Sequence, residues 1–305
     1  MNKHGGNHRQ ARTGITGTVM LAAVSGALAA GAIAASGTAT ASCASISGVK
    51  VGSGCDSTAS SFAVGVGNGA QAKSQGVANG AVAVGENATA LAVGTFNLAY
   101  ANGKDSVAVA GGALNVAATQ GDNSVAVAAG TGNLALNLGK NAFVVGQGTG
   151  NVALNVGDGD ITEDTIDPDD LDDPNSVDAP PGFNVVQASG IGNLAANLGG
   201  KGAIVKATGG LNRALNIGGT SNEVTATGGL NSALSVGGTG SRVKATNDFD
   251  MSKPFKLSNI GLNTAINIGG KSNTATAGPG PGATAITAGG SNKTAIQQKF
   301  GIKFK

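Results

Sequence analysis

The sequence reads NLAANLG at Asn193–Gly199, NRALNIG at Asn212–Gly218 and NSALSVG at Asn231–Gly237, and this repeat decides the fold. The three segments begin at equal spacing, and related segments at Asn133 and Asn151 have a spacing that is one residue shorter. A fixed period of this size is typical of a solenoid, in which successive coils of the chain stack on one another. The repeat therefore predicts a stack of equivalent coils.

Each 19-residue unit carries a second short segment, which reads VKAT at Val205–Thr208 and VTAT at Val224–Thr227. Both segments of a unit alternate with a period of two residues and are separated by Gly-Gly or Gly-Thr. The unit therefore predicts two short strands joined by tight turns. The alternation leads us to expect that Ala214, Ile217 and Val236 face the interior.

The first half of the chain has different repeats that follow the same rule. Alternating runs read FAVGVG at Phe62–Gly67, AVAVG at Ala81–Gly85, SVAVAG at Ser106–Gly111 and SVAVA at Ser124–Ala128. Gly/Asn turns separate these runs, and none of them has a helical period. The fold class that we predict is all-β, a parallel β-solenoid or β-roll with coils of about 18–20 residues.

Two solenoid blocks are predicted, at residues 61–157 and 183–305, separated by a Pro-containing segment at residues 158–182. From Asp158 to Asp178 this segment has ten acidic residues and no basic residue, which predicts a solvated, disordered loop. The last residues, 299–305, alternate apolar and basic side chains. This alternation predicts a capping strand at the end of the second block.

A calcium site is the alternative interpretation of the acidic segment. Asp158, Asp160, Thr162 and Asp164 supply oxygen ligands at alternate positions, and oxygen is the ligand that calcium prefers. The Gly and the closing Glu of an EF-hand loop are missing, however. We therefore expect a plain acidic loop, with calcium-dependent assembly as the competing hypothesis.

Residues 1–41 have the pattern of a secretory signal peptide. Lys3, Arg9 and Arg12 precede an uncharged apolar run and the small residues of Ala39–Ala41. We expect a signal helix that is cleaved after this triplet, and a protein that is secreted or held in the cell envelope. An uncleaved anchor is the alternative, because the 17-residue apolar run is near the lower limit for crossing a bilayer. After cleavage no stable membrane span is predicted.

Cys43 and Cys55 are the only cysteines, and they follow the predicted cleavage position closely. In an oxidising compartment we predict a disulfide between them, which closes an N-terminal cap at residues 42–60. A loop this short contributes about 3 kcal/mol at most in the chain-entropy model. Lipid attachment at Cys43 is a third fate for the N-terminus, although Thr40 stands where a lipidation signal has an aliphatic residue.

Asparagine recurs at the first and fifth positions of the seven-residue motif. Stacked amides would hydrogen-bond from coil to coil as a structural ladder, and Asn also tolerates the left-handed conformation of turns. The predicted ladder residues are Asn133, Asn137, Asn151, Asn155, Asn193, Asn197, Asn212, Asn216, Asn231, Asn263 and Asn267. An outward array that binds ice, glycan or mineral is the alternative interpretation of these residues.

Composition argues against catalysis and against a nucleic-acid partner. Signal cleavage would remove His4 and His8, the only histidines, and with them the usual general base. It would also remove three basic residues, so the formal net charge would fall from +2 to −1. We predict no enzyme activity, no cofactor, no metal site and no nucleic-acid binding. After residue 179 the chain has 12 Lys or Arg and three acidic residues. Such a basic surface could contact an anionic envelope polymer or nucleic acid, but we expect these side chains mainly to keep exposed strands soluble and to block edge pairing.

The predicted function is that of a secreted or cell-surface structural and adhesive protein. It would present an extended solenoid surface to an unknown polymer or protein, as a monomer or as a homo-oligomer. Binding to ice or to another crystal surface is the alternative function. It requires outward Thr and Asn in register over at least four coils, whereas Thr208, Thr227 and Thr246 give three.

The units at residues 81–94, 106–111 and 124–130 resemble the head repeats of trimeric autotransporter adhesins. This resemblance covers residues 61–130, about a quarter of the chain. It implies a parallel β-roll, a trimer and adhesion to host surface or matrix proteins. The whole chain is also similar to secreted Gly/Ala/Asn-rich proteins of actinobacteria, and this similarity implies export without implying a mechanism.

Overall fold

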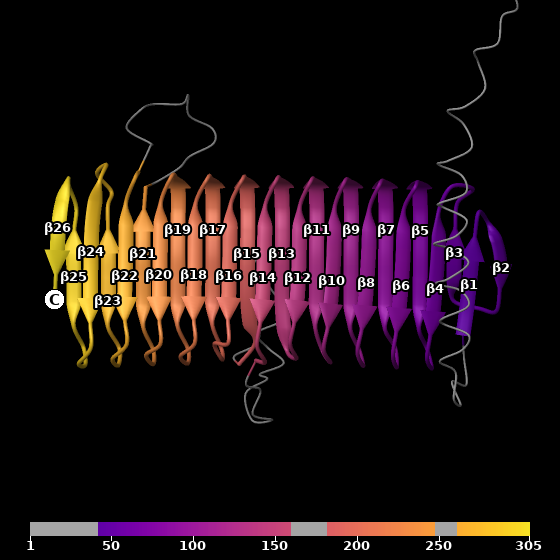
Figure 1. Ribbon diagram of the computed structural model, residues 1–305, viewed down its shortest axis with the longest axis horizontal. Helices are drawn as coiled ribbons and strands as arrows, with labels where there is room; N and C mark the ends of the chain where they lie inside the picture. Colours follow the sequence, from indigo (N-terminus) through magenta and orange to yellow (C-terminus); the bar gives the residue numbers. More distant parts are fainter. Residues whose placement is uncertain (1–41, 160–181, 248–260) are drawn as a thin grey trace, which may run out of the picture. The chain divides into compact units, whose positions relative to one another are not determined.

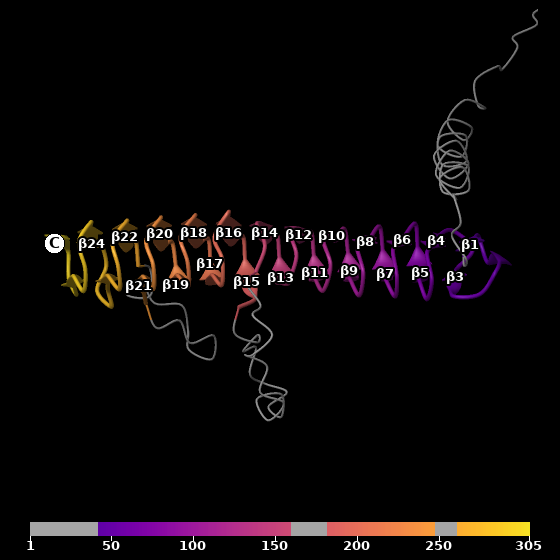
Figure 2. The same cartoon turned by 90° about the horizontal axis from the view of Figure 1, so that it is seen from below.

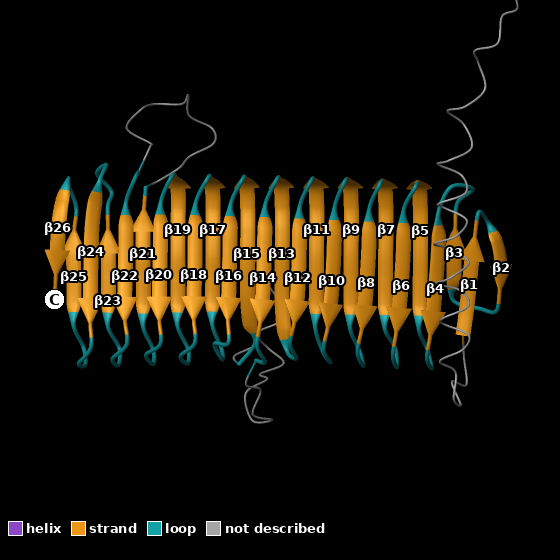
Figure 3. Ribbon diagram, viewed as in Figure 1, coloured by secondary structure: helices purple, strands orange, loops and turns teal. Residues whose placement is uncertain are grey.

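The protein is built from β-strands, as the alternating sequence predicts. A computed structural model describes residues 42–159, 182–247 and 261–305. These residues form 26 strands and contain no helix (Figure 3). The all-β prediction is therefore confirmed, and the predicted signal peptide lies outside the described residues.

The strands form two sheets, which Figure 2 shows as two layers. Sheet A has 14 strands, in the order β2 (Val49–Val51), β1 (Ser42–Ile46), β4 (Phe62–Val66), β6 (Gly80–Val84), β8 (Leu98–Asn102), β10 (Val116–Gln120), β12 (Leu134–Leu138), β14 (Val152–Val156), β16 (Leu194–Leu198), β18 (Arg213–Ile217), β20 (Ser232–Val236), β22 (Thr264–Ile268), β24 (Ala283–Ala288) and β26 (Gly301–Phe304).

Sheet B has 12 strands and lies against sheet A. Its order is β25 (Thr294–Gln297), β23 (Thr274–Ala277), β21 (Arg242–Thr246), β19 (Glu223–Gly229), β17 (Ile204–Gly210), β15 (Asn184–Ile191), β13 (Ala142–Thr149), β11 (Val125–Thr131), β9 (Val107–Ala113), β7 (Thr89–Thr95), β5 (Gln71–Val77) and β3 (Cys55–Ser57). The chain thus passes alternately through the two sheets, and one passage through both makes one coil (Figure 1).

The coils stack as parallel strands in a constant register. Val116 pairs with Leu134 in the next coil, eighteen residues later, and Leu194 pairs with Arg213, nineteen residues later. Near the end of the chain Thr264 pairs with Thr284, a step of twenty residues. These steps confirm the parallel β-solenoid and its predicted coil length.

Two longer steps interrupt the regular period without breaking the stack. Val152 on β14 pairs with Leu194 on β16, and the chain between them includes the whole predicted acidic loop, residues 158–182. Ser232 on β20 pairs with Thr264 on β22, and the repeat analysis did not anticipate this second interruption. Residues 160–181 and 248–260 lie outside the described residues, and so does most of the candidate calcium segment.

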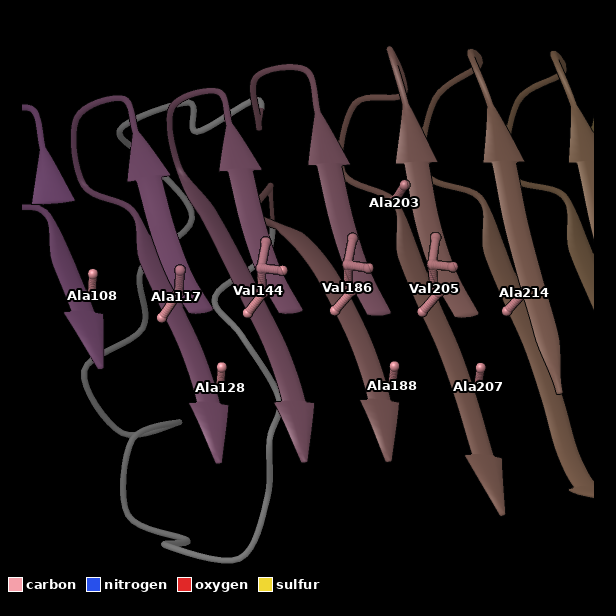
Figure 4. Close-up of a cluster of buried hydrophobic side chains, with 14 of the residues drawn as sticks. Ala108, Ala117, Ala128, Val144, Val186, Ala188, Ala203, Val205, Ala207 and Ala214 are labelled. Atoms are coloured by element: carbon pink, nitrogen blue, oxygen red, sulfur yellow. The ribbon is translucent and has the colours of Figure 1, made fainter. Parts of the chain in front are cut away.

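The interior between the sheets is lined by small aliphatic side chains. Figure 4 shows Val144, Val186 and Val205 at equivalent positions of successive strands, and all three are fully buried. On sheet A the equivalent inward residue is alanine in every coil from Ala63 to Ala285. Alanine at these positions of sheet A lets the two sheets pack closely around the valines of sheet B.

The expectation for Ile217 and Val236 was wrong. Ala214 is fully buried, but Ile217 is 40% exposed on the outer side of β18, and Val236 occupies the equivalent outward position on β20. Residues three positions apart on a strand point to opposite sides, so Ala214 and Ile217 cannot both face inward. Asn216 shares the interior with Ala214 instead.

Strands β1, β2 and β3 form the N-terminal end of the described stack. Cys43 on β1 and Cys55 on β3 form a disulfide with their Cα atoms 5.4 Å apart, which confirms this pair. Strand β1 runs antiparallel to both β2 and β4, in contrast to the parallel pairing of the coils. The hairpin β1–β2 thereby covers the edge of the first coil, and the disulfide joins the two sheets there.

Turns that leave sheet B depend on glycine. Gly209 has a φ of +105°, and a Cβ atom at this position would overlap the carbonyl oxygen of Gly228 in the next coil. Gly190 and Gly228 occupy the same place in the neighbouring coils, also with positive φ. Only glycine combines this backbone conformation with such a close approach of successive turns.

Candidate binding faces

The asparagine at the first position of each motif lies in a buried column at the turn into sheet A. The backbone N–H of Asn212 donates to Oδ1 of Asn193 at 2.9 Å, and its own Oδ1 accepts from the N–H of Asn231 at 2.9 Å. Its Nδ2 donates to the backbone carbonyls of Thr208 at 2.6 Å and Gly228 at 2.7 Å. One amide therefore links three successive coils.

The same column extends further toward the N-terminus than the repeat analysis recognised. Asn79, Asn97 and Asn115 make equivalent bonds, such as that from the Asn97 N–H to Oδ1 of Asn79 at 2.7 Å. Their motifs lack the second Asn, but each lies a whole number of coil lengths before Asn133. Counting back by this period is the sequence signal that identifies them.

The asparagine at the fifth position forms a second buried column, on the inner side of sheet A. Nδ2 of Asn155 donates to Oδ1 of Asn137 at 2.7 Å, and Nδ2 of Asn216 donates to Oδ1 of Asn197 at 2.8 Å. Asn267 occupies the same column and accepts from the Thr287 hydroxyl at 2.8 Å. An amide Oδ1 that accepts a hydrogen bond from the next coil therefore has a hydrogen-bond partner although it is buried.

Because alanine and asparagine fill the interior, the large aliphatic residues of sheet A lie on its outer side. One column contributes an apolar residue from each of the 14 strands. Its members are Val51, Ala44, Val64, Val82, Tyr100, Ala118, Leu136, Leu154, Ala196, Leu215, Leu234, Ile266, Ile286 and Phe304. We call the outer side of sheet A the apolar face. Arg213 is the only charged residue at the outward positions of these described strands.

The two end strands make the pattern of the apolar face clearest. On β26 the outward residues Ile302 and Phe304 are 76% and 66% exposed, while Lys303 stands at the inward position that Ala285 occupies one coil earlier. On β2 the outward residues Val49 and Val51 are 72% and 69% exposed.

The outer side of sheet B changes character along the stack. From β7 to β13 it carries mainly aliphatic residues, whereas from β17 to β21 it carries mainly lysine and threonine, beside Ile204 and the ion pair of Arg242 with Glu223. Lys206, Thr225 and Lys244 form one outward column. Thr208, Thr227 and Thr246 form a second column beside it, and we call these two columns the basic face.

The threonine column is short, as the sequence count predicts. On one side the column continues with Ser189 on β15, which pairs with Thr208. On the other side it ends at Thr246, because the pairing of β21 with β23 stops at Ala245 and Ala277 and gives Thr246 no partner position. The neighbouring column alternates lysine with threonine. A flat threonine array over four or more coils is therefore not formed by these columns.

Charged turn residues bind one another from coil to coil. Asp122 accepts a hydrogen bond from the backbone N–H of Lys104 at 2.9 Å and pairs with the Lys140 ammonium at 3.0 Å. These contacts hold the pKa of the Asp122 carboxyl below its usual value, with the backbone bond as the larger cause. Asp158, the first residue of the candidate calcium segment, accepts from the Lys140 N–H at 2.8 Å. These carboxylates therefore connect the turns of successive coils.

Among residues 42–159, 182–247 and 261–305, no group of three or more His, Cys, Asp or Glu is placed to hold a metal ion. The same residues contain no helix with the length and apolarity that a membrane span requires. No family model, no curated protein and no solved structure matches the chain. The two outer faces are thus the features from which a function can be argued.

Proposed function

We propose that this chain is an exported structural and adhesive protein that acts through the outer surface of its solenoid and not through catalysis. The basic face is the part that contacts an anionic surface polymer or protein. The resemblance of residues 61–130 to adhesin head repeats supports an adhesive role. The Cys43–Cys55 disulfide supports export, because such bonds persist in oxidising compartments.

The basic face carries the proposal because its charges recur at a fixed spacing on a rigid sheet. Lys206 and Lys244 are two coils apart in one column, which places them about 9.6 Å apart at the usual strand spacing. Neither lysine forms an ion pair with a described carboxylate. Threonine hydroxyls lie beside them and supply hydrogen-bond donors and acceptors for a polar ligand.

Solid-phase binding tests this proposal. The protein purified after expression of the full chain would be offered acidic envelope polysaccharides and host matrix proteins at low and high salt. Replacing Lys206 and Lys244 by glutamine should weaken binding to the preferred polymer about tenfold or more, and added salt should do the same. Binding to none of these materials would contradict adhesion and leave a purely structural role.

Lys201→Gln with Lys271→Gln is the matched control, because it removes two lysines from turns of the same part of the stack. This control should bind like the original protein. An equal loss in both double variants would mean that net charge, and not the basic face, determines binding. N-terminal sequencing of the exported protein tests the predicted cleavage after Ala41.

A further inference from the structure

We propose that the apolar face is covered by a second copy of this chain, so that two solenoids pack sheet A against sheet A. This inference rests on the proposed function, because it decides which face remains free for adhesion. In such a dimer the two sheet B surfaces, each with its basic face, point away from the interface. The dimer would therefore present two adhesive surfaces.

The size of the face is the first argument. Fourteen strands at a spacing of about 4.8 Å, each about five residues long at about 3.3 Å per residue, give the outer side of sheet A an area of about 1,100 Å². Its central column is apolar throughout, whereas the flanking outward positions include polar residues such as Asn102, Gln120 and Thr264. Apolar patches above a few hundred Å² are rare on monomeric proteins. Packing two such faces would bury about 2,200 Å² in total, which is in the range of obligate dimers.

The composition of the face is the second argument. The outward positions of β12, β14 and β16 hold eight Leu or Val residues and one Ala. This composition resembles that of a permanent interface more than that of a transient one, whose surface would mix polar and apolar groups. A lone Arg213 within the face leaves the surface nearly free of like-charge repulsion between two copies.

The end strands are the third argument, because they show that the face extends over the whole stack. Among the described residues, Val51 on β2 and Phe304 on β26 each belong to a strand that pairs on one side only. A partner that covers both must be as long as the solenoid itself. A second copy has this length, and its side-chain columns repeat at the same coil spacing.

The turn residues beside the apolar face give a fourth argument. Leu211 and Leu230 are exposed and adopt a φ of +57° and +59°, a left-handed conformation that leucine disfavours. The equivalent turn positions Gly132, Gly150 and Gly192 adopt the same conformation with glycine. Leucine thus replaces a less strained residue at the rim of sheet A, as expected where side chains make a contact.

A lipid surface is the main competing occupant of such a face. Helices and sheets that lie on membranes place Lys, Arg and aromatic residues around an apolar centre. Here the single tyrosine, Tyr100, lies in the central column of the face, and no lysine occupies an outward position of its described strands. The arrangement therefore favours a protein surface of matching composition.

Light scattering coupled to size-exclusion chromatography tests the proposal on protein purified after expression of the full chain. At micromolar concentration the mass should be twice that of one chain. Leu234→Lys places a charge in the central column of the apolar face and should weaken association about 100-fold or more, giving a single-chain mass. Thr227→Lys adds the same charge in the same part of the stack, but on the outer side of sheet B, and should remain dimeric.

Circular dichroism must show equal strand content for all forms, and Leu234→Gln serves as the milder variant if the lysine impairs folding. A single-chain mass for the original protein, or equal dissociation by Thr227→Lys, would overturn the proposal. A single-chain protein that binds phosphatidylcholine vesicles would assign the face to lipid instead. The Leu234→Lys monomer should still bind polymer through Lys206 and Lys244, so the two proposals fail independently.

Discussion

Replacing Asn212 by aspartate probes the buried amide column with almost no change of shape. The Asn212 side chain is fully buried, and its Nδ2 donates to Oδ1 of Asn193 at 3.1 Å and to two backbone carbonyls at 2.6 and 2.7 Å. An ionised carboxylate would place negative charge against these three acceptors. The new carboxyl group at position 212 should therefore stay protonated in the folded state, with its pKa raised.

The cost of the substitution follows from two contributions. A protonated carboxyl can donate to one of the three acceptors, so two hydrogen bonds are lost at about 1 kcal/mol each. Holding it protonated at about pH 7, about three units above its unperturbed pKa, costs about 4 kcal/mol more. Because the folded pKa is raised, this second cost is absent below about pH 4 and grows as the pH rises.

Urea unfolding followed by far-UV circular dichroism measures this difference. We expect Asn212→Asp to lower the free energy of unfolding by about 6 kcal/mol at pH 7 and by about 2 kcal/mol at pH 4. Asn292→Asp is the matched control, because Asn292 is an exposed turn residue that already has a left-handed φ of +55°. A loss at pH 7 no larger than that of the control, or a loss independent of pH, would refute the reasoning.

Three further predictions concern the ends and the turns of the stack. Lys303→Ala removes the charge from the inward position of β26, so concentrated protein should aggregate end to end by light scattering, whereas Lys299→Ala should not. Replacing Cys43 and Cys55 by serine should lower the free energy of unfolding by about 3 kcal/mol or less in urea, and hydrogen exchange should increase in β1–β4 but not in β18–β22. Asp122→Asn should lower the melting temperature by about 1 °C at about pH 7, and this difference should shrink as the pH falls below about 4. The sign follows because a carboxyl with a lowered folded pKa stabilises only above that pKa, and a difference that persists in acid would exclude this cause.

The fold was predictable because the sequence motif recurs once in each coil. Asn193, Asn212 and Asn231 recur at equal spacing, and the alternation within each unit identifies two strands. The step from Ser232 to Thr264 was missed because the inserted residues fall between two good copies of the motif. A search for repeats finds equivalent segments, but it does not require that they be adjacent in the stack.

The direction in which side chains point was harder to predict. The usual rule places large aliphatic residues inside, and it led to Ile217 and Val236 being assigned to the interior. The rule fails on sheet A because its inward positions hold small or polar residues such as alanine and asparagine, while the buried valines of the interior come from sheet B. The buried asparagine column was the overlooked signal. Residues two positions apart on a strand point to the same side, so Ala214 faces inward with Asn216, and the adjacent Ile217 faces outward.

Iodide quenching of Tyr100 fluorescence tests the packing of the apolar face most directly. Tyr100 lies in the central column of that face and is the only tyrosine in a chain without tryptophan, so its emission reports on this surface alone. We predict weak quenching at high protein concentration, stronger quenching on dilution, and strong quenching of Leu234→Lys at every concentration. Quenching that is equal in both proteins and independent of concentration would contradict the assignment of this face to a second copy.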